Sequence, residues 1–239
     1  MYLKTFLICP TVFLSFLFVF PISVSAQNGF QIGTITSVKG EVDIISLVNG
    51  SRRDGADETA ILESEQIRTG VKSGASLILL DGTHVDILPF SIINVRRASS
   101  VSGDGIPALS LRMLSGRVRV RVPSLAGGER MFFLKTPTLI ASVRGTDIGL
   151  VAVLKDARIV VYEGEVEVGN RSPSVKRSYI LRTRQTARVK EGEPPSEIKY
   201  LDMSVLENIL DQYEITRQNK IQLQVREPEM LFDRMVKKR

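Results

Sequence analysis

Short apolar runs separated by turn residues fill the chain from Gln31 to about residue 190. One clear example is Leu77–Leu80, which is followed by Asp81-Gly82-Thr83 and then by the alternating Val85 and Ile87. An Asp-Gly pair between alternating apolar residues is typical of a two-residue hairpin turn. Alternation with a period of two places successive side chains on opposite faces of a sheet. The pattern therefore predicts many short strands that each bury one face.

Glycine turns punctuate three further pairs of strand-like runs, at Lys39-Gly40, Ser115-Gly116 and Glu163-Gly164. We expect hairpins about the second and third of these turns, because an alternating run stands on each side of the glycine. After Gly116, arginines at 117, 119 and 121 alternate with valines, which indicates one wet and one buried face.

The segment 136–147, TPTLIASVRGTD, concentrates turn residues between two apolar runs. Thr136-Pro137 fixes a backbone angle and removes a hydrogen-bond donor, so the chain enters by a turn or an edge. Arg144-Gly145-Thr146-Asp147 then separates the run 139–143 from the run 148–154. We expect a positive φ at Gly145 and an ion pair of Arg144 with Asp147 or Glu163 that pins two strands together.

These elements predict an all-β domain over residues 27–192, built as a sandwich or as a short solenoid-like β-domain. The hydrophobic period changes after Pro194-Pro195. Ser204 and Glu207 form a capping box, and apolar residues follow at helical spacing. We expect a linker, a short amphipathic α-helix and a tail over 193–239. The helix either packs on the β-domain or docks a partner.

Residues 1–26 have the pattern of a cleavable signal peptide, with Lys4, an apolar core and the small residues Val24 and Ala26. We expect export to the periplasm or the medium, cleavage after Ala26, and only transient insertion of this segment in a membrane. A retained anchor is the alternative. Cys9 is the single cysteine and lies within this segment, so the mature chain would have no disulfide or thiol nucleophile.

The net charge of +6 falls to +5 when the segment that contains Lys4 is removed, and the isoelectric point is near 9.5. Export excludes nucleic acid as a partner, and leaves anionic envelope polymers or lipid head groups as what a basic surface could meet. Residues 171–190 hold seven Lys or Arg and no acid, which indicates a solvated basic rim.

Catalytic and metal-binding patterns are weak. His84 is the single histidine and has Asp86 two residues along the strand, but no nucleophile elbow accompanies them. Glu163 and Glu165 are the nearest pair of carboxylates for glycoside cleavage, at a position where acids are usually just exposed. Three loop acids fit no calcium loop: Asp54, Asp57 and Glu58. We expect no catalytic residue, metal or cofactor; a hydrolase using His84 or the glutamates is the weakest alternative.

The arginine row at 117, 119 and 121 is a more plausible functional surface. Three like charges on one strand face repel one another unless acids on a neighbouring strand answer them. Glu163, Glu165 and Glu167 have the same period of two. Salt bridges between these two strands are therefore favoured over an anion-binding surface formed by Arg117, Arg119 and Arg121.

The order of motifs along residues 31–170 resembles the FecR domain. The resemblance rests on Asp81-Gly82-Thr83, Pro89-Phe90-Ser91, Thr136-Pro137, Val143–Asp147 and Glu163-Gly164. It implies a β-rich extracytoplasmic domain that contacts another envelope protein and has no enzyme activity. Ile148 replaces the family's usual aromatic residue after the acid.

Founding members of the FecR family are membrane-anchored anti-sigma regulators with a cytoplasmic segment before their membrane span. Only four residues precede the apolar stretch here, so we expect the β-domain to carry over and the anti-sigma role not to. The expected function is envelope signalling or binding through protein contact. The alternative is a structural envelope protein whose basic surface binds anionic cell-wall polymer or lipid head groups.

Overall fold

The computed structural model describes residues 29–101, 107–124, 131–202 and 204–205. These residues form seventeen β-strands, which confirms the all-β fold class. Ser204 and Val205 are helical, but the rest of the predicted C-terminal helix and the whole signal segment lie outside the described residues. Within them, none of the helical structure has the length and apolar character that a membrane crossing requires.

The strands form two sheets, A and B. The order in sheet A is β4 (Ala60–Leu62), β1 (Gln31–Lys39), β6 (Gly74–Leu79), β7 (His84–Ile87), β9 (Pro107–Arg121), β12 (Asp147–Val153), β13 (Asp156–Glu163), β16 (Gln185–Lys190) and β17 (Lys199–Tyr200). The order in sheet B is β3 (Arg52–Asp54), β2 (Val42–Ser46), β5 (Glu65–Thr69), β8 (Ile92–Val101), β9, β10 (Phe132–Lys135), β11 (Leu139–Val143), β14 (Glu165–Asn170) and β15 (Ser178–Arg182).

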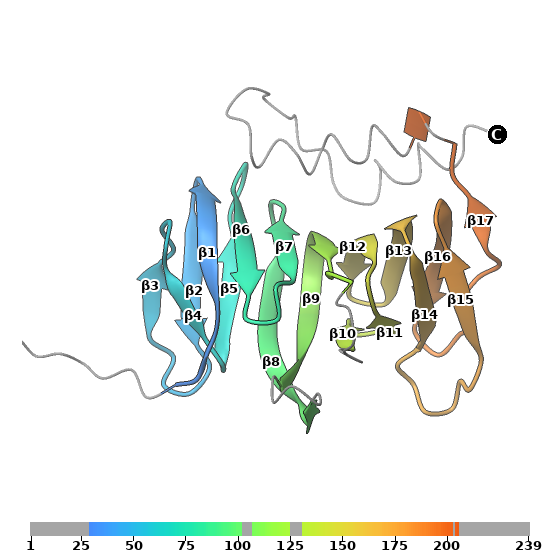
Figure 1. The fold of residues 1–239 in the computed structure, drawn as a ribbon, viewed down its shortest axis with the longest axis horizontal. Helices are drawn as coiled ribbons and strands as arrows, with labels where there is room; N and C mark the ends of the chain where they lie inside the picture. The colour runs from blue at the N-terminus through green and yellow to red at the C-terminus, as the bar shows by residue number, and fades with distance from the viewer. Residues whose placement is uncertain (1–28, 102–106, 125–130, 203, 206–239) are drawn as a thin grey trace, which may run out of the picture.

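The two sheets face each other as a sandwich, and the chain advances along its long axis from β3 to β17 (Figure 1). Nearly all the described pairings are antiparallel; β9 and β10 form a parallel pair. A β-solenoid would stack parallel coils, so the architecture is a sandwich that progresses like a solenoid. This decides between the two arrangements that the sequence left open.

The core lies between the sheets and follows the alternation of each strand. Val118 and Val120 of β9 are fully buried, and so are Leu150 and Ile159 on the neighbouring strands of sheet A. Sheet B contributes aliphatic side chains and Phe132 to the same cluster. Burying one such side chain stabilises a fold by about 1.5–3 kcal/mol, so this continuous layer is the main stabilising feature of the domain.

Nine corners carry the chain from one sheet to the other through described residues, and each corner contains one residue with positive φ. Four are glycines and five are not: Gly40, Glu58, Ser64, Lys72, Phe90, Gly116, Gly145, Gly164 and Arg184. The left-handed region reverses the local direction of the chain within one residue, which lets a strand leave one sheet and enter the facing sheet. Gly145 confirms the positive φ predicted for it, at 55°.

Two of the predicted hairpins are corners instead. The alternating runs about Ser115-Gly116 belong to one strand, β9, whose first part pairs in sheet B and whose second part pairs in sheet A. Strands β13 and β14, on either side of Gly164, pair in different sheets. By contrast, β6 and β7 form the hairpin predicted about Asp81-Gly82.

Residues after 192 also pack on the sandwich. The segment 196–201 runs along β16, because Ser196 N–H donates to Arg188 O at 2.8 Å and Leu201 N–H donates to Arg184 O at 2.9 Å. Leu201 is buried. The β-domain thus extends to residue 201, beyond the boundary at 192 that the sequence suggested.

Candidate functional site

The corner between β7 and β8 holds the chain in an unusual conformation. Pro89 ends β7, Phe90 has φ of +60° and Ser91 begins the return into sheet B. A bulky residue in the left-handed region is a conformational outlier that costs about 1–2 kcal/mol, since its Cβ crowds the following carbonyl. Such strain persists only where the surrounding structure fixes it.

Thr69 and Ser91 supply that constraint. Thr69 Oγ1 donates to Leu88 O at 2.7 Å and accepts from Ser91 N–H at 2.9 Å, while Ser91 O accepts from Thr69 N–H at 3.0 Å. Ser91 Oγ also lies 2.7 Å from Leu88 O and accepts from Arg117 N–H at 3.0 Å. Both hydroxyls are buried. The corners of β5, β7 and β9 are therefore tied together around Phe90.

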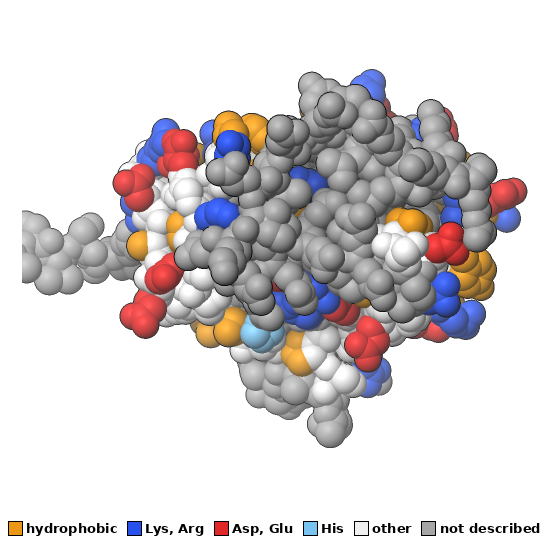
Figure 2. Space-filling view, turned by 90° about the horizontal axis from the view of Figure 1, so that it is seen from above, with side chains coloured by type: hydrophobic (Ala, Val, Ile, Leu, Met, Phe, Trp, Pro, Cys, Tyr) orange, Lys and Arg blue, Asp and Glu red, His pale blue; other side chains and the backbone are white. Residues whose placement is uncertain are grey.

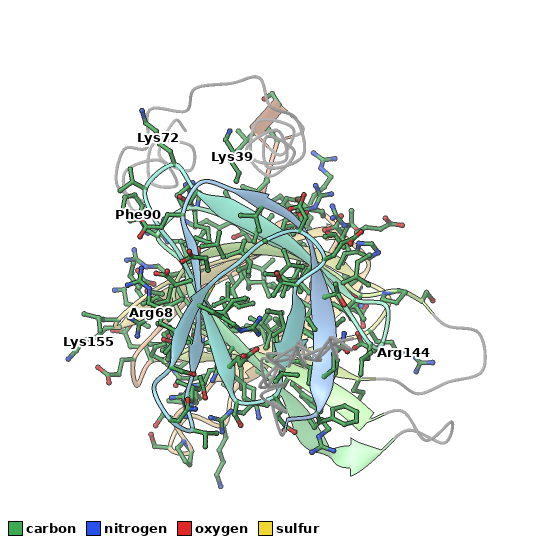
Figure 3. All side chains as sticks on the ribbon, turned by 90° about the vertical axis from the view of Figure 1, so that its left-hand side faces the viewer. Lys39, Arg68, Lys72, Phe90, Arg144 and Lys155 are labelled. Carbon is green, nitrogen blue, oxygen red and sulfur yellow. The ribbon has the colours of Figure 1, made fainter. Side chains whose placement is uncertain are left out.

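The Phe90 side chain is not used by this network. Its residue is 46% exposed, and Figure 3 shows it pointing away from the sandwich on the side that also presents Arg68 and Lys72. An open hollow of about 310 Å³ lies beside it, lined by Glu41, Asp43, Arg68, Thr69, Gly70, Phe90 and Ile92. We refer to these residues as the Phe90 hollow.

The walls of the hollow differ in chemistry. Asp43 and Glu41 form a carboxylate wall, and Arg52 binds both from the adjacent strand at 2.7 and 3.4 Å. Arg68 is the cross-strand neighbour of Asp43 on β5 and donates to Gln66 Oε1 at 2.7 Å. Ile92, the neighbour of Arg68 on β8, and the Phe90 ring supply apolar surface. Such a combination suits the side chains of a partner protein, which present apolar and charged groups together.

The sequence motifs are mostly structural parts of turns and corners. Asp81 Oδ1 accepts from Thr83 N–H at 2.9 Å in the hairpin that Gly82 turns. Thr136 Oγ1 accepts from Leu139 N–H at 2.8 Å in the turn that contains Pro137. Thr146 Oγ1 contacts Arg144 O and Glu165 O at 2.7 and 3.0 Å, which joins the corners at Gly145 and Gly164.

The predicted pairing of Arg144 is wrong. Asp147 instead accepts two hydrogen bonds from Arg119, and no hydrogen bond or ion pair of the Arg144 side chain occurs within the described part of the chain. Arg144 is exposed and lies on the opposite side of the sandwich from Phe90 (Figure 3). Glu163 is also exposed, facing Asp147 across the strands rather than a cation.

The arginine row forms salt bridges, but with partners other than those predicted. Arg119 pairs with Asp147 at 2.6 Å and Arg121 pairs with Asp86 at 2.7 Å, both within sheet A. Of the predicted glutamates, Glu165 and Glu167 lie on β14 in sheet B, whereas Glu163 ends β13 in sheet A. Glu165 binds Arg182 and Glu167 accepts from Ser178. Arg117 is buried. Arg119 and Arg121 thus have acidic partners in sheet A.

Electrostatics strengthen the Arg119 pair. Burial by itself lowers the pKa of Arg119, but the hydrogen bond and the charge of Asp147, helped by Tyr162 and Asp86, outweigh it and raise the pKa. The Arg119 guanidinium also lies 5.3 Å from the centre of the Tyr162 ring.

The catalytic patterns gain no support from the geometry. The Asp86 carboxylate accepts from Ser76 Oγ and from Arg121, each at 2.7 Å, so its two oxygens are engaged by groups other than His84. Glu165 is bound to Arg182. Among the described residues, no three His, Cys, Asp or Glu side chains cluster in a way that could hold a metal ion.

In the sequence, Phe90 stands out only as part of the Pro89-Phe90-Ser91 motif. The available signal was weak: a phenylalanine that follows a proline at the end of an alternating strand, outside the buried register. Sequence alone does not reveal a positive φ at a residue other than glycine, because the tertiary hydrogen bonds around it impose that conformation.

Comparisons with solved structures found two crystal structures, at 1.65 and 2.50 Å, of a "putative anti-sigma factor" from Parabacteroides distasonis. Both are 18% identical to this chain with a TM-score of 0.47 and cover 61% of it. The chain spans 64% and 63% of their lengths. A "cell surface anchoring domain" is 33% identical over 28% of this chain and 86% of its own, with a TM-score of 0.26.

No curated protein matches the chain. Residues 65–167 match the family model described as FecR protein, and this range runs from β5 through β14. It contains the hairpin at Gly82 and the corners at Phe90, Gly116, Gly145 and Gly164, and therefore the motifs on which the resemblance rested. Over residues 65–167, the family model confirms the resemblance to the FecR domain.

Proposed function

We propose that this chain is an exported, non-catalytic FecR-domain protein that acts in envelope signalling or binding by contacting another envelope protein at the Phe90 hollow. The FecR match supports a signalling-related role. The signal-like pattern of residues 1–26 supports export, although those residues lie outside the described structure.

The proposal rests on one observation: the backbone of Phe90 is strained while its side chain is exposed. The strained backbone costs stability, and an aromatic ring that is 46% exposed recovers only part of the apolar burial it could have. Asparagine or glycine would fit the same φ at lower cost. A role outside the fold explains why an aromatic side chain occupies this corner, and aromatic anchors are enriched where proteins bind one another.

The hollow suits a protein partner better than a metabolite. At about 310 Å³ it lies at the lower limit of small-molecule sites, and it is open rather than enclosed. The carboxylates on its wall are already bound by Arg52. One or two partner side chains packed against Phe90 and Ile92 would match this size and chemistry.

Binding of an anionic polymer is less supported. Three cations of the segment 171–190 form ion pairs within the chain: Arg182 with Glu165, Arg188 with Asp156 and Lys190 with Glu193. In the part of the surface that Figure 2 describes, basic and acidic side chains are interspersed rather than segregated. A polymer binder would use a continuous surface of one sign.

Site-specific photocrosslinking in cells tests the proposal with the full chain. A photoreactive phenylalanine analogue at position 90 keeps an aromatic ring in place, and we expect it to form an adduct with a distinct envelope protein. The same analogue at Arg144, on the opposite side of the sandwich, is the matched control. An equal adduct from both positions, or none from position 90, would refute the proposed contact.

Two substitutions separate the contact from the fold. Phe90→Asn keeps a residue that tolerates positive φ, so we expect the stability to change by less than about 1 kcal/mol while the partner is lost. Phe90→Tyr should retain the partner. A polymer-binding role would appear as steep release with rising salt, whereas a packed protein contact should respond much less.

A further inference from the structure

The four edges of the sandwich are protected unequally. At the N-terminal end, β3 and β4 have three residues each, and Arg53 joins them by donating to Ala60 O at 3.0 Å and to Glu65 at 2.8 Å. At the other end, the segment 196–201 runs along β16. Short strands and covering segments are the usual protections of a sheet edge. In the described structure, β15 (Ser178–Arg182) is the edge that lacks both.

The hydrogen bonds of the turn after β15 show which backbone groups face outward. Arg182 N–H donates to Gln185 Oε1 at 2.7 Å, so it points away from β14. In an antiparallel strand, outward-pointing groups recur every second residue. The N–H and C=O of Ile180 therefore also point away from β14, and neither has a hydrogen-bond partner within the residues that the structure describes.

The side chain of Ile180 adds apolar surface to this edge. Ile180 is 48% exposed, while its neighbour Leu181 is fully buried in the core. An added strand could form backbone hydrogen bonds with Ile180. Its side chains would alternate between the buried face that holds Leu181 and the exposed face that holds Ile180. These are the elements of recognition by β-strand addition.

Charge selects the occupant. Lys176 and Arg177 precede the edge strand and form no ion pair among the described residues, whereas Arg182 at its end is already paired with Glu165. A second copy of this chain would place the same cations against one another, whereas a strand with carboxylates would complement them. We propose that the β15 edge binds an extended acidic segment of a partner protein by strand addition, independently of the Phe90 hollow.

A synthetic peptide with the sequence of residues 164–170, GEVEVGN, is the probe. In the fold this sequence already pairs with β15 from its other side, with Glu165 opposite Arg182. We expect the labelled peptide to bind the full chain, as measured by fluorescence anisotropy. The charge-reversed peptide GKVKVGN should bind about tenfold more weakly, since two favourable cross-strand charge interactions become repulsive. Equal binding of both peptides would overturn the proposal.

Ile180→Pro tests the geometry. Proline removes the outward N–H and is tolerated on an edge where that N–H faces solvent, so the domain should fold and lose peptide binding. Ile180→Lys keeps the N–H and adds an edge charge that disfavours strand addition, and it should also weaken binding. Ile180→Val should bind as the natural chain does.

The possible outcomes distinguish an acidic strand at the β15 edge from binding elsewhere and from a second copy of the chain. Peptide binding that survives both Ile180→Pro and Ile180→Lys would show that the edge is not the site. Concentration-dependent dimers of the full chain that Ile180→Pro abolishes would show that a second copy takes the edge, which also overturns the proposal. Phe90→Asn should leave peptide binding unchanged, so failure here and failure of the proposed Phe90 contact are distinguishable.

Discussion

Arg119 of β9 binds the carboxylate of Asp147 on β12 through two hydrogen bonds, 2.9 Å from Nε and 2.6 Å from Nη2. Their side chains are only 11% and 16% exposed. The bidentate geometry joins the C-terminal part of the long strand β9 to the first residue of β12, which follows the corner at Gly145. The cation that binds Asp147 at this corner is therefore Arg119 of β9, and not Arg144, which lies nearby in the sequence.

Arg119→Met should destabilise the domain by about 3 kcal/mol, because it leaves the partly buried Asp147 carboxylate without its partner. Arg144→Met is the control and should change stability by less than about 0.5 kcal/mol, since that exposed side chain has no partner among the described residues. Urea denaturation measures both. The raised pKa of Arg119 means its contribution is complete below its ordinary pKa and is lost only in strong alkali. Equal destabilisation by both variants would contradict this assignment.

Gly116→Ala should cost about 3 kcal/mol or more. Gly116 has φ of +109°, and a Cβ there would lie 2.4 Å from Ser91 Cα and 2.3 Å from Ser91 Oγ. Gly192→Ala is a matched control with φ of +71° and no atom within 4 Å of the new Cβ. It should cost only about 1 kcal/mol. Thermal and urea unfolding distinguish the two, and equal losses would refute the close packing inferred at Ser91.

Lys72→Gly should stabilise the domain by about 0.5 kcal/mol. Glycine relieves the positive φ of 53° at Lys72, and this gain slightly exceeds the extra entropy that glycine has in the unfolded chain. Lys39→Gly, within strand β1, should instead destabilise by about 0.5–1 kcal/mol because no strain is relieved there. The sign of the difference in urea midpoint is the readout; a loss at Lys72 would mean its corner is not strained.

Ser91→Ala should cost about 2 kcal/mol, because it removes the acceptor of Arg117 N–H inside the protein. Ser178→Ala removes a hydroxyl that contacts Glu167 at the surface and should change stability by less than about 0.5 kcal/mol. Amide hydrogen exchange provides a second measurement, since the Arg117 amide should lose protection in the first variant. Unchanged protection there would contradict the role given to Ser91.

Local patterns were enough to predict the strands and one hairpin. The alternation of Val118 and Val120 with arginines placed one face of β9 in the core, and Asp81-Gly82 placed a turn between β6 and β7. Both features depend on residues that are close together in the sequence. The same holds for the positive φ at Gly145, which needs a residue without a Cβ.

Long-range features could not be read in this way. A glycine between two alternating runs has the same appearance whether the chain folds back within a sheet or crosses to the facing sheet, so the sequence predicts hairpins at Gly116 and Gly164. The strand that neighbours β9 decides which acid meets Arg119, and that neighbour is β12 rather than β14. The exposed and strained Phe90 depends on hydrogen bonds from Thr69, which is 21 residues away.

Strand β9 pairs in both sheets, and it connects the strands that precede it in the chain to those that follow it. These two halves of the sandwich therefore share one strand and are not joined by a loop alone. The first half ends and the second begins within a single backbone that crosses the core at Gly116. A pull on either end of the molecule would be transmitted through this one strand to the other end. The domain should accordingly bear load as one mechanical element, and a signal received at one end could reach the other without a hinge.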